Sequence, residues 1–141
     1  MPACVAAHKG VWPLKIGCVL DSSAVLALML RETGYKAAEQ MLPRAAISAV
    51  NASQVIAKLM RLGAGPEEAR RAIDDLGVAV LPFTLEDAEV AAGLEQMTRA
   101  PGLSLGDRAC LAAAKRCGVA DVTADQNWRI PSLGVQVRYI R

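Results

Sequence analysis

The chain has 141 residues, a length typical of one domain, and 53% of them are hydrophobic, which is enough for a core. Charged residues make up 21% and the formal net charge is +2, a balance too mild to identify a nucleic-acid binder. The four cysteines form no CxxC pair, and no apolar stretch reaches the roughly 20 residues that span a bilayer. Residues 1–15 lack the uninterrupted apolar run that is typical of a signal peptide. A secreted disulfide scaffold and a membrane protein are therefore not expected, and a soluble, cytoplasmic protein is predicted.

The first half of the chain alternates between predicted strands and helices. Residues 1–15 show no clear period and are predicted to form an extension ahead of a domain over 16–141. An apolar run over 16–20 predicts a buried strand that ends at Asp21. Ser22 or Ser23 can cap the following helix, and Gly34 lies just past its end. A weaker, Ala-rich strand is predicted over 45–50, and Asn51 can cap a second helix that Gly63 ends.

The second half continues this alternation. The third predicted helix runs from Pro66 to Gly77, and a strand over 78–81 follows it. A fourth helix, capped by Thr84, is expected to reach about residue 99, and a fifth runs from Ser104 to Gly118. Strands are then predicted over 119–122 and 135–139. This order predicts an α/β fold with a mainly parallel sheet covered by helices on both faces.

Three aspartates lie where a parallel sheet usually carries its chemistry. Asp21 and Asp125 each follow a predicted strand, and Asp107 lies in the first turn of the fifth helix. Carboxylates that converge repel one another, and a bound cation is the main means of offsetting that cost. A metal-polarised water can attack a phosphodiester while the cation neutralises charge on the phosphate. The pattern therefore predicts a Mg²⁺ or Mn²⁺ site.

Each aspartate also has a purely local interpretation, which the sequence leaves open. Asp107 stands three residues after Ser104, the spacing of a capping box, and an acid is favourable at any helix start. Asp125 can hydrogen-bond the backbone of its own turn, and Asp21 can cap the helix that follows it.

Other kinds of site have weaker support. His8 is the only histidine and lies in the extension, so histidine-based hydrolases and His-rich zinc sites are not expected, and there is no Gly-rich phosphate loop. Trp128 could stack on a base or cover the core edge. Basic side chains could contact an RNA backbone or simply face solvent: Arg108, Lys115, Arg116, Arg129 and Arg138.

Four blocks of the sequence, in this order and spacing, resemble the blocks of PIN domains, and among these the VapC-type toxins of VapBC toxin–antitoxin pairs. The resemblance covers roughly residues 16–140. The blocks are CVLDSSAVLA from Cys18, ISAVNASQV from Ile47, LSLGDRACLA from Leu103 and TADQNW from Thr123.

The resemblance implies an α/β/α sandwich with an acidic pocket that binds Mg²⁺ or Mn²⁺ and cleaves RNA as an endoribonuclease, under the control of a cognate antitoxin. Asp21, Asp107 and Asp125 match the acidic positions of this family. Ser22, Asn51 and Thr123 match polar positions of the pocket, and Arg108 is a further candidate for substrate contact. The predicted helices after Ser22 and Asn51 are rich in Leu, Met and Ala, which suits a core or a homodimer surface.

The sequence departs from the family at Gln54, where a glutamate is usual. An amide keeps an oxygen ligand but has no charge, so the site loses one negative charge and a possible base. The exchange is compatible with an engineered substitution, with natural attenuation, or with a site that works with three carboxylates. With Asn51 as cap, Gln54 could also complete a capping box.

Two other functions therefore stay open beside the nuclease. One is a PIN fold that has lost catalysis and acts through RNA or protein binding, as the neutral Gln54 suggests. The other is a phosphoryl-transfer or receiver-type domain with Asp21 as acceptor. Haloacid-dehalogenase-like enzymes carry Asp-x-Asp at that point, whereas this chain has Asp21-Ser22-Ser23.

Overall fold

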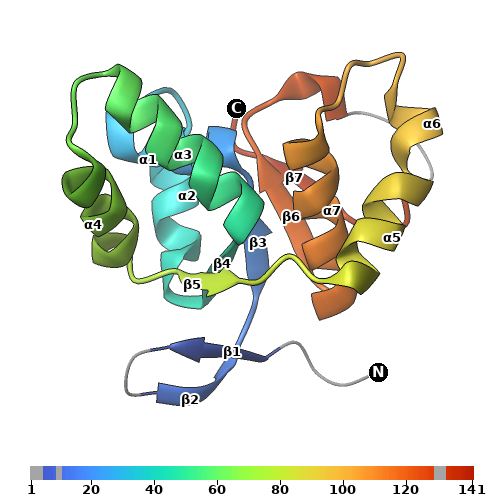
Figure 1. Cartoon of the computed structure of the whole chain (residues 1–141), viewed down its shortest axis with the longest axis horizontal. Helices are drawn as coiled ribbons and strands as arrows, with labels where there is room; N and C mark the ends of the chain where they lie inside the picture. The colour runs from blue at the N-terminus through green and yellow to red at the C-terminus, as the bar shows by residue number, and fades with distance from the viewer. Residues whose placement is uncertain (1–4, 9–10, 129–132) are drawn as a thin grey trace.

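The structure is a computed structural model that describes residues 5–8, 11–128 and 133–141. Its central sheet has five strands in the order β5-β4-β3-β6-β7, and every neighbouring pair is parallel (Figure 1). The prediction of a parallel sheet is confirmed. The strands are β3 (Cys18–Leu20), β4 (Ala45–Ser48), β5 (Ala79–Leu81), β6 (Ala120–Thr123) and β7 (Val137–Tyr139).

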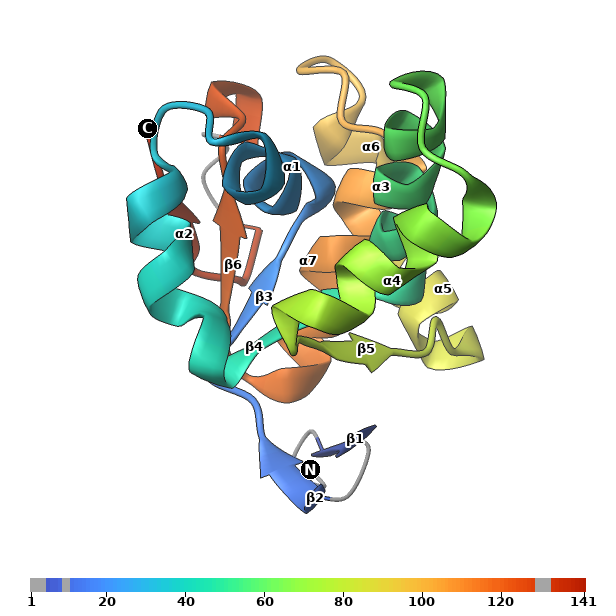
Figure 2. The ribbon, with the colours of Figure 1, turned by 90° about the vertical axis from the view of Figure 1, so that its left-hand side faces the viewer.

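Helices cover both faces of this sheet and make a three-layer sandwich, as predicted. Adjacent residues of a strand point to opposite faces, so Leu20 belongs to one core cluster and Val19 to the other. The first cluster lies under α1 (Ser22–Leu30), α2 (Tyr35–Met41), α3 (Ala49–Arg61) and α4 (Pro66–Leu76), which Figure 2 shows from the side. The second lies under α5 (Leu85–Gly93), α6 (Glu95–Thr98) and α7 (Leu105–Cys117), and two short 3-10 helices are η1 (Leu42–Arg44) and η2 (Gln126–Trp128).

The predicted serine cap of α1 and the predicted Asn51 cap of α3 are wrong, whereas the alternative that Asp21 caps α1 is confirmed. Asp21, and neither of the serines after it, caps α1 by accepting a hydrogen bond from the backbone N–H of Ala24. Ser48, and not Asn51, caps α3, because the β4 strand ends early enough for its hydroxyl to accept from the N–H of Val50. Asn51 therefore lies inside the first turn of α3, and the capping-box interpretation of Gln54 is excluded.

The described residues also contain two α-helices more than the prediction, because one predicted helix is divided and another was not predicted. The helix after Thr84 ends at Gly93, and a separate short helix, α6, follows it; glycine is a poor helix former and weakens the helix there. α2 was not predicted; it has only seven residues and begins after Gly34, which is in a left-handed conformation with φ of 94°. Such a short helix shows less than two periods of the apolar pattern.

Residues 1–15, which the sequence predicted to be an extension without regular structure, contain two strands. β1 (Val5–His8) and β2 (Val11–Lys15) form an antiparallel sheet of their own, and β1 contacts β5 (Figure 1). Among the described residues, no helix combines the length and the apolar character that crossing a membrane requires.

The sheet topology brings three strand ends together. The chain leaves β3 toward β4 on one side and later returns to place β6 on the other side, so the strand order reverses between β3 and β6. Leu20 is in register with both Ile47 and Val122, which puts the carboxyl ends of these three strands at one edge. Such a switch point is where open parallel sheets usually bind their ligands.

Candidate active site

Asp21 is the most deeply placed of the predicted site residues, with 1% of its surface exposed. One carboxylate oxygen accepts hydrogen bonds from the N–H of Ala24 at 2.8 Å and from the Ser23 hydroxyl at 2.7 Å. The other accepts from the Thr123 hydroxyl at 2.5 Å. Burial raises the pKa of Asp21 to about 6 in spite of these hydrogen bonds. No cationic side chain among the described residues forms an ion pair with it.

Thr123 links Asp21 to Asp125. Its hydroxyl donates to Asp21 and also accepts from the backbone N–H of Asp125 at 2.9 Å. A carboxylate oxygen of Asp125 accepts from the N–H of Asn127 at 2.9 Å, so the predicted local turn is present. The fully buried Thr123 hydroxyl therefore joins the backbone of Asp125 to the cap of α1.

Asp107 approaches from α7. It forms the predicted capping box with Ser104: its carboxylate accepts from the Ser104 N–H at 2.9 Å, and its own N–H donates to the Ser104 hydroxyl at 3.2 Å. Partial burial is the main cause that raises its pKa, and the negative charge of Asp125 adds to the effect. Asp107 in turn raises the pKa of Asp21. Asp107 thus interacts by charge with both Asp21 and Asp125, while each of the three acids also performs its local role.

Sequence reasoning missed two members of this cluster. Ser23, rather than Ser22, contacts Asp21, and the Ser23 hydroxyl also accepts from the N–H of Ala124 at 2.9 Å. Ser22 is half-buried, and its side chain makes no hydrogen bond within the described part of the chain. Only the helix start at Asp21 decides which serine turns inward.

Asp121 is the second residue that was missed. It lies fully buried in the middle of β6, and neither of its carboxylate oxygens has a hydrogen-bond partner in the described structure. Burial raises its pKa well above the usual range, and the charges of Asp21 and Asp107 add to this. The neighbouring Cys110 thiol favours the charged form but makes no hydrogen bond of normal geometry. The sequence did contain a signal for this residue, namely an acidic residue inside a predicted buried strand.

Gln54 and Asn51 lie one turn apart on α3, at its contact with α7. The Asn51 amide nitrogen donates to Oε1 of Gln54 at 2.9 Å and to the backbone oxygen of Gly106 at 3.0 Å. Asn51 is fully buried and Gln54 half-buried. The oxygen through which Gln54 could replace a glutamate is therefore already an acceptor within the protein.

The basic and aromatic candidates take mostly structural positions. Arg108 donates to the backbone oxygen of Ala91 in α5 at 3.0 Å. Arg116 forms an ion pair with the buried Asp87, with Nε at 2.9 Å from a carboxylate oxygen. Trp128 is 1% exposed and packs in the core, which excludes base stacking by its ring in this conformation. Lys115 and Arg138 are exposed, and Arg129 lies outside the described residues.

The donor atoms of the site suit a hard divalent cation. Carboxylates and hydroxyls supply only oxygen, and the buried charge of Asp21 lacks a cationic partner among the described residues. No three His, Cys, Asp or Glu side chains of those residues lie close enough to ligate one ion, so an all-protein cage is not formed. Mg²⁺ commonly takes one or two carboxylates and keeps several waters, and the residues present fit that mode.

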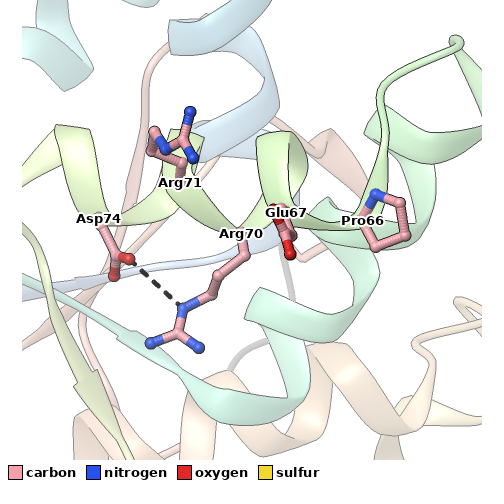
Figure 3. Close-up of a pocket in the computed structure, with 5 residues that line it drawn as sticks. All are labelled: Pro66, Glu67, Arg70, Arg71 and Asp74. Carbon is pink, nitrogen blue, oxygen red and sulfur yellow. Dashed lines mark ion pairs between the residues drawn. The ribbon is translucent and has the colours of Figure 1, made fainter.

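A separate hollow on the surface has no such chemistry. It measures about 450 Å³ and runs along α4, where it is lined by Pro66, Glu67, Arg70, Arg71 and Asp74 (Figure 3). Arg70 and Asp74 form an exposed ion pair at 3.5 Å across it. None of the predicted site residues lines this hollow.

Comparison with known proteins connects this geometry to a family. The family model described as PIN domain matches residues 18–131 of the chain. No curated protein matches the chain at a significant level of sequence similarity.

Three solved structures illustrate the similarity in fold. A toxin–antitoxin complex from Klebsiella pneumoniae is similar with a TM-score of 0.70 and 19% identity, covering 89% of this chain and 98% of that one. DNA-bound VapBC from Salmonella typhimurium gives 0.68 and 16%, covering 89% and 99%. VapBC-5 from Mycobacterium tuberculosis gives 0.60 and 17%, covering 89% and 98%. At these identities the likeness establishes the fold.

Proposed function

The chain belongs to the PIN domain family, and from this premise we propose that it is a Mg²⁺- or Mn²⁺-dependent endoribonuclease, the toxin of a VapBC-type toxin–antitoxin pair. The observation that carries the proposal is Asp21: a carboxylate that is 1% exposed, lacks a cationic partner among the described residues, and lies within the electrostatic reach of Asp107. A protein tolerates such a group most readily when a bound cation completes it.

The proposed chemistry assigns a task to each residue. A divalent cation, when bound, would polarise a water for attack on the phosphodiester and neutralise the developing charge. Asp21, Asp107 and Asp125 would hold it, directly or through water. Thr123 and Ser23 keep the Asp21 carboxylate in one orientation by donating to its two oxygens. Gln54 would contribute an uncharged side chain, and Ser22, Asn51 and Arg108 are proposed for the surroundings of the substrate.

Partners are proposed from the same resemblance. The titles of two of the similar structures, those from Klebsiella pneumoniae and Mycobacterium tuberculosis, name toxin–antitoxin systems, which supports a cognate antitoxin for this chain. Exposed apolar side chains near the ends of α1 and α3 suit a homodimer or antitoxin contact: Leu30, Met60 and Leu62. We further propose that the protein acts in the cytoplasm. We also propose that residues 1–15 lie outside the domain, since the family match begins at residue 18.

The test is RNA cleavage by purified protein free of any antitoxin. Cleavage in Mn²⁺ should be abolished by EDTA and by Asp21→Asn. Because Gln54 replaces the usual acid, the same assay is run on Gln54→Glu, which should cut faster. If neither the parent nor Gln54→Glu cuts any RNA in Mn²⁺, the proposal fails.

The alternative is a PIN fold that binds RNA or protein without cutting. Gln54 favours it, since its Oε1 is engaged with Asn51 and it adds no charge to the site. Calorimetry separates the two, because the binding module predicts weak Mn²⁺ binding. Tight binding of Mn²⁺ in a fixed stoichiometry would count against the alternative.

A further inference from the structure

Gly106, in the first turn of α7, lies directly against the head group of Gln54 on α3. A Cβ atom at Gly106 would meet Nε2 of Gln54 at 2.2 Å and Cδ and Oε1 at 2.5 Å, so the Gln54 head group would have to move to admit it. Gly106 is not among the glycines with positive φ, so its backbone conformation does not require glycine. Alanine would be the better helix former here. A side chain at residue 106 is therefore incompatible with the present position of the Gln54 head group.

Asn51 also takes part in this contact, by hydrogen bonds to both Gln54 and Gly106. Its amide nitrogen donates both to Oε1 of Gln54 and to the backbone oxygen of Gly106, at 2.9 and 3.0 Å, so one side chain holds both partners. Asn51 is fully buried, and its own Oδ1 has no hydrogen-bond partner in the described structure. An unpaired buried acceptor destabilises the fold. In the described structure Asn51 is therefore held through its nitrogen, which joins residue 54 to the turn that precedes Asp107.

We propose that Asn51 and Gly106 are positioning residues that fix the head group of residue 54 and the first turn of α7 relative to each other. Asp107 follows Gly106 directly and is held to the same turn by its capping box with Ser104. The clamp formed by Asn51, Gln54 and Gly106 thus determines where Asp107 lies with respect to α3. This inference rests on the proposed function, since its consequence is the geometry of a cation site.

The clamp also bears on the exchange at residue 54. A glutamate would offer one carboxylate oxygen to Asn51, as Oε1 of Gln54 does now, and keep a second oxygen free. Asn51 is therefore suited to orient either an amide or a carboxylate. The clamp is expected to persist in Gln54→Glu.

The first test is Asn51→Ala, with Mn²⁺ affinity measured by calorimetry and folding by thermal unfolding. Groups that orient metal ligands typically change the affinity by 10- to 100-fold when removed, so a loss of about 10-fold or more is expected. Thr84→Ala is the matched control: it removes the cap of α5, away from the clamp, and should lower Tm by about 4 °C with Mn²⁺ affinity unchanged. A Mn²⁺ affinity of Asn51→Ala equal to that of the parent overturns the proposal.

The second test uses Gly106→Ala, which displaces the Gln54 head group without touching Asn51. It should weaken Mn²⁺ binding in the parent but have no such effect in Gln54→Ala, where the space is vacant. Equal effects in both backgrounds would refute the clamp. If the parent binds no Mn²⁺ at all, the proposed function itself fails. If the parent binds and all clamp variants bind equally well, only the present inference fails.

Discussion

Asp87 and Asp21 are buried to the same depth, at 2% and 1% exposed, yet their surroundings differ in one respect. Asp87 receives both Nε and a terminal nitrogen of Arg116, at 2.9 and 3.2 Å, and it also completes the capping box of α5. Asp21 caps α1 in a comparable way but has no cationic partner among the described residues. The charge of Asp87 is therefore paired by Arg116 within the fold, whereas the charge of Asp21 would have to be paired by a bound cation. Burial of an acid alone does not mark a site; burial without a counter-ion at the carboxyl end of a strand makes an acid a candidate site residue.

The sharpest way to break this comparison is to neutralise both acids. Asp21→Asn should lower RNA cleavage by about 1000-fold, the equivalent of about 4 kcal/mol of lost stabilisation by the cation, without loss of stability. Asp87→Asn should do the reverse: it leaves Arg116 opposite a neutral amide, so stability falls by about 2 kcal/mol while cleavage per folded molecule is kept. Parallel cleavage and denaturation assays decide this. If Asp21→Asn unfolds the protein, the carboxylate is structural like Asp87.

The pH dependence of stability is the next largest effect. The pKa of Asp21 rises from its unfolded value near 4 to about 6 in the fold, so the folded state binds its proton more tightly. Its contribution is present below pH 4 and is lost as the pH rises through 6, a loss of about 3 kcal/mol. The raised pKa values of Asp107 and Asp121 act in the same direction. Denaturation in EDTA between pH 4 and 7.5 should show this decline.

Two controls make that measurement specific. Mn²⁺ should restore stability near pH 7, because a ligand that binds only the folded state stabilises it. Asp21→Asn should flatten the decline. A metal-free protein whose stability rises between pH 4 and 6 would contradict the assignment of an uncompensated charge.

Features that depend on local sequence pattern could be predicted, whereas features that depend on packing between distant segments could not. The alternation of apolar runs with capped helices predicts the parallel sheet, and position after a strand selects Asp21 and Asp125. Asp121 escapes that logic, because it lies within a strand where side-chain direction and depth depend on packing against α7. The choice between Ser22 and Ser23 likewise depends on where α1 begins, within one residue. The clamp at Gly106 joins residues 52 positions apart, and no local pattern reports it.

The ion pair of Asp87 allows a smaller, purely structural test. Arg116→Met keeps the aliphatic stem but removes the cation, and leaving Asp87 buried alone should cost about 2 kcal/mol, less than for a fully buried pair because the Arg116 side chain is 30% exposed. Arg70→Met is the matched control, since its pair with Asp74 is largely exposed and should matter by about 0.5 kcal/mol or less. Equal losses would mean that burial does not distinguish the two pairs.

Asp121 gives the smallest expected effect and the most direct reading of the comparison. Asp121→Val replaces an unpaired buried carboxyl with a β-branched side chain suited to a strand, and should raise stability by about 1 kcal/mol at pH 7. The gain should shrink toward pH 4, where the acid is protonated and its charge no longer costs anything. Asp121→Asn, which removes the charge but keeps a polar group, should give only part of it. A loss of stability in both variants would mean that Asp121 has a stabilising partner. Asp121 would then resemble Asp87, whose charge is paired within the fold, and not Asp21.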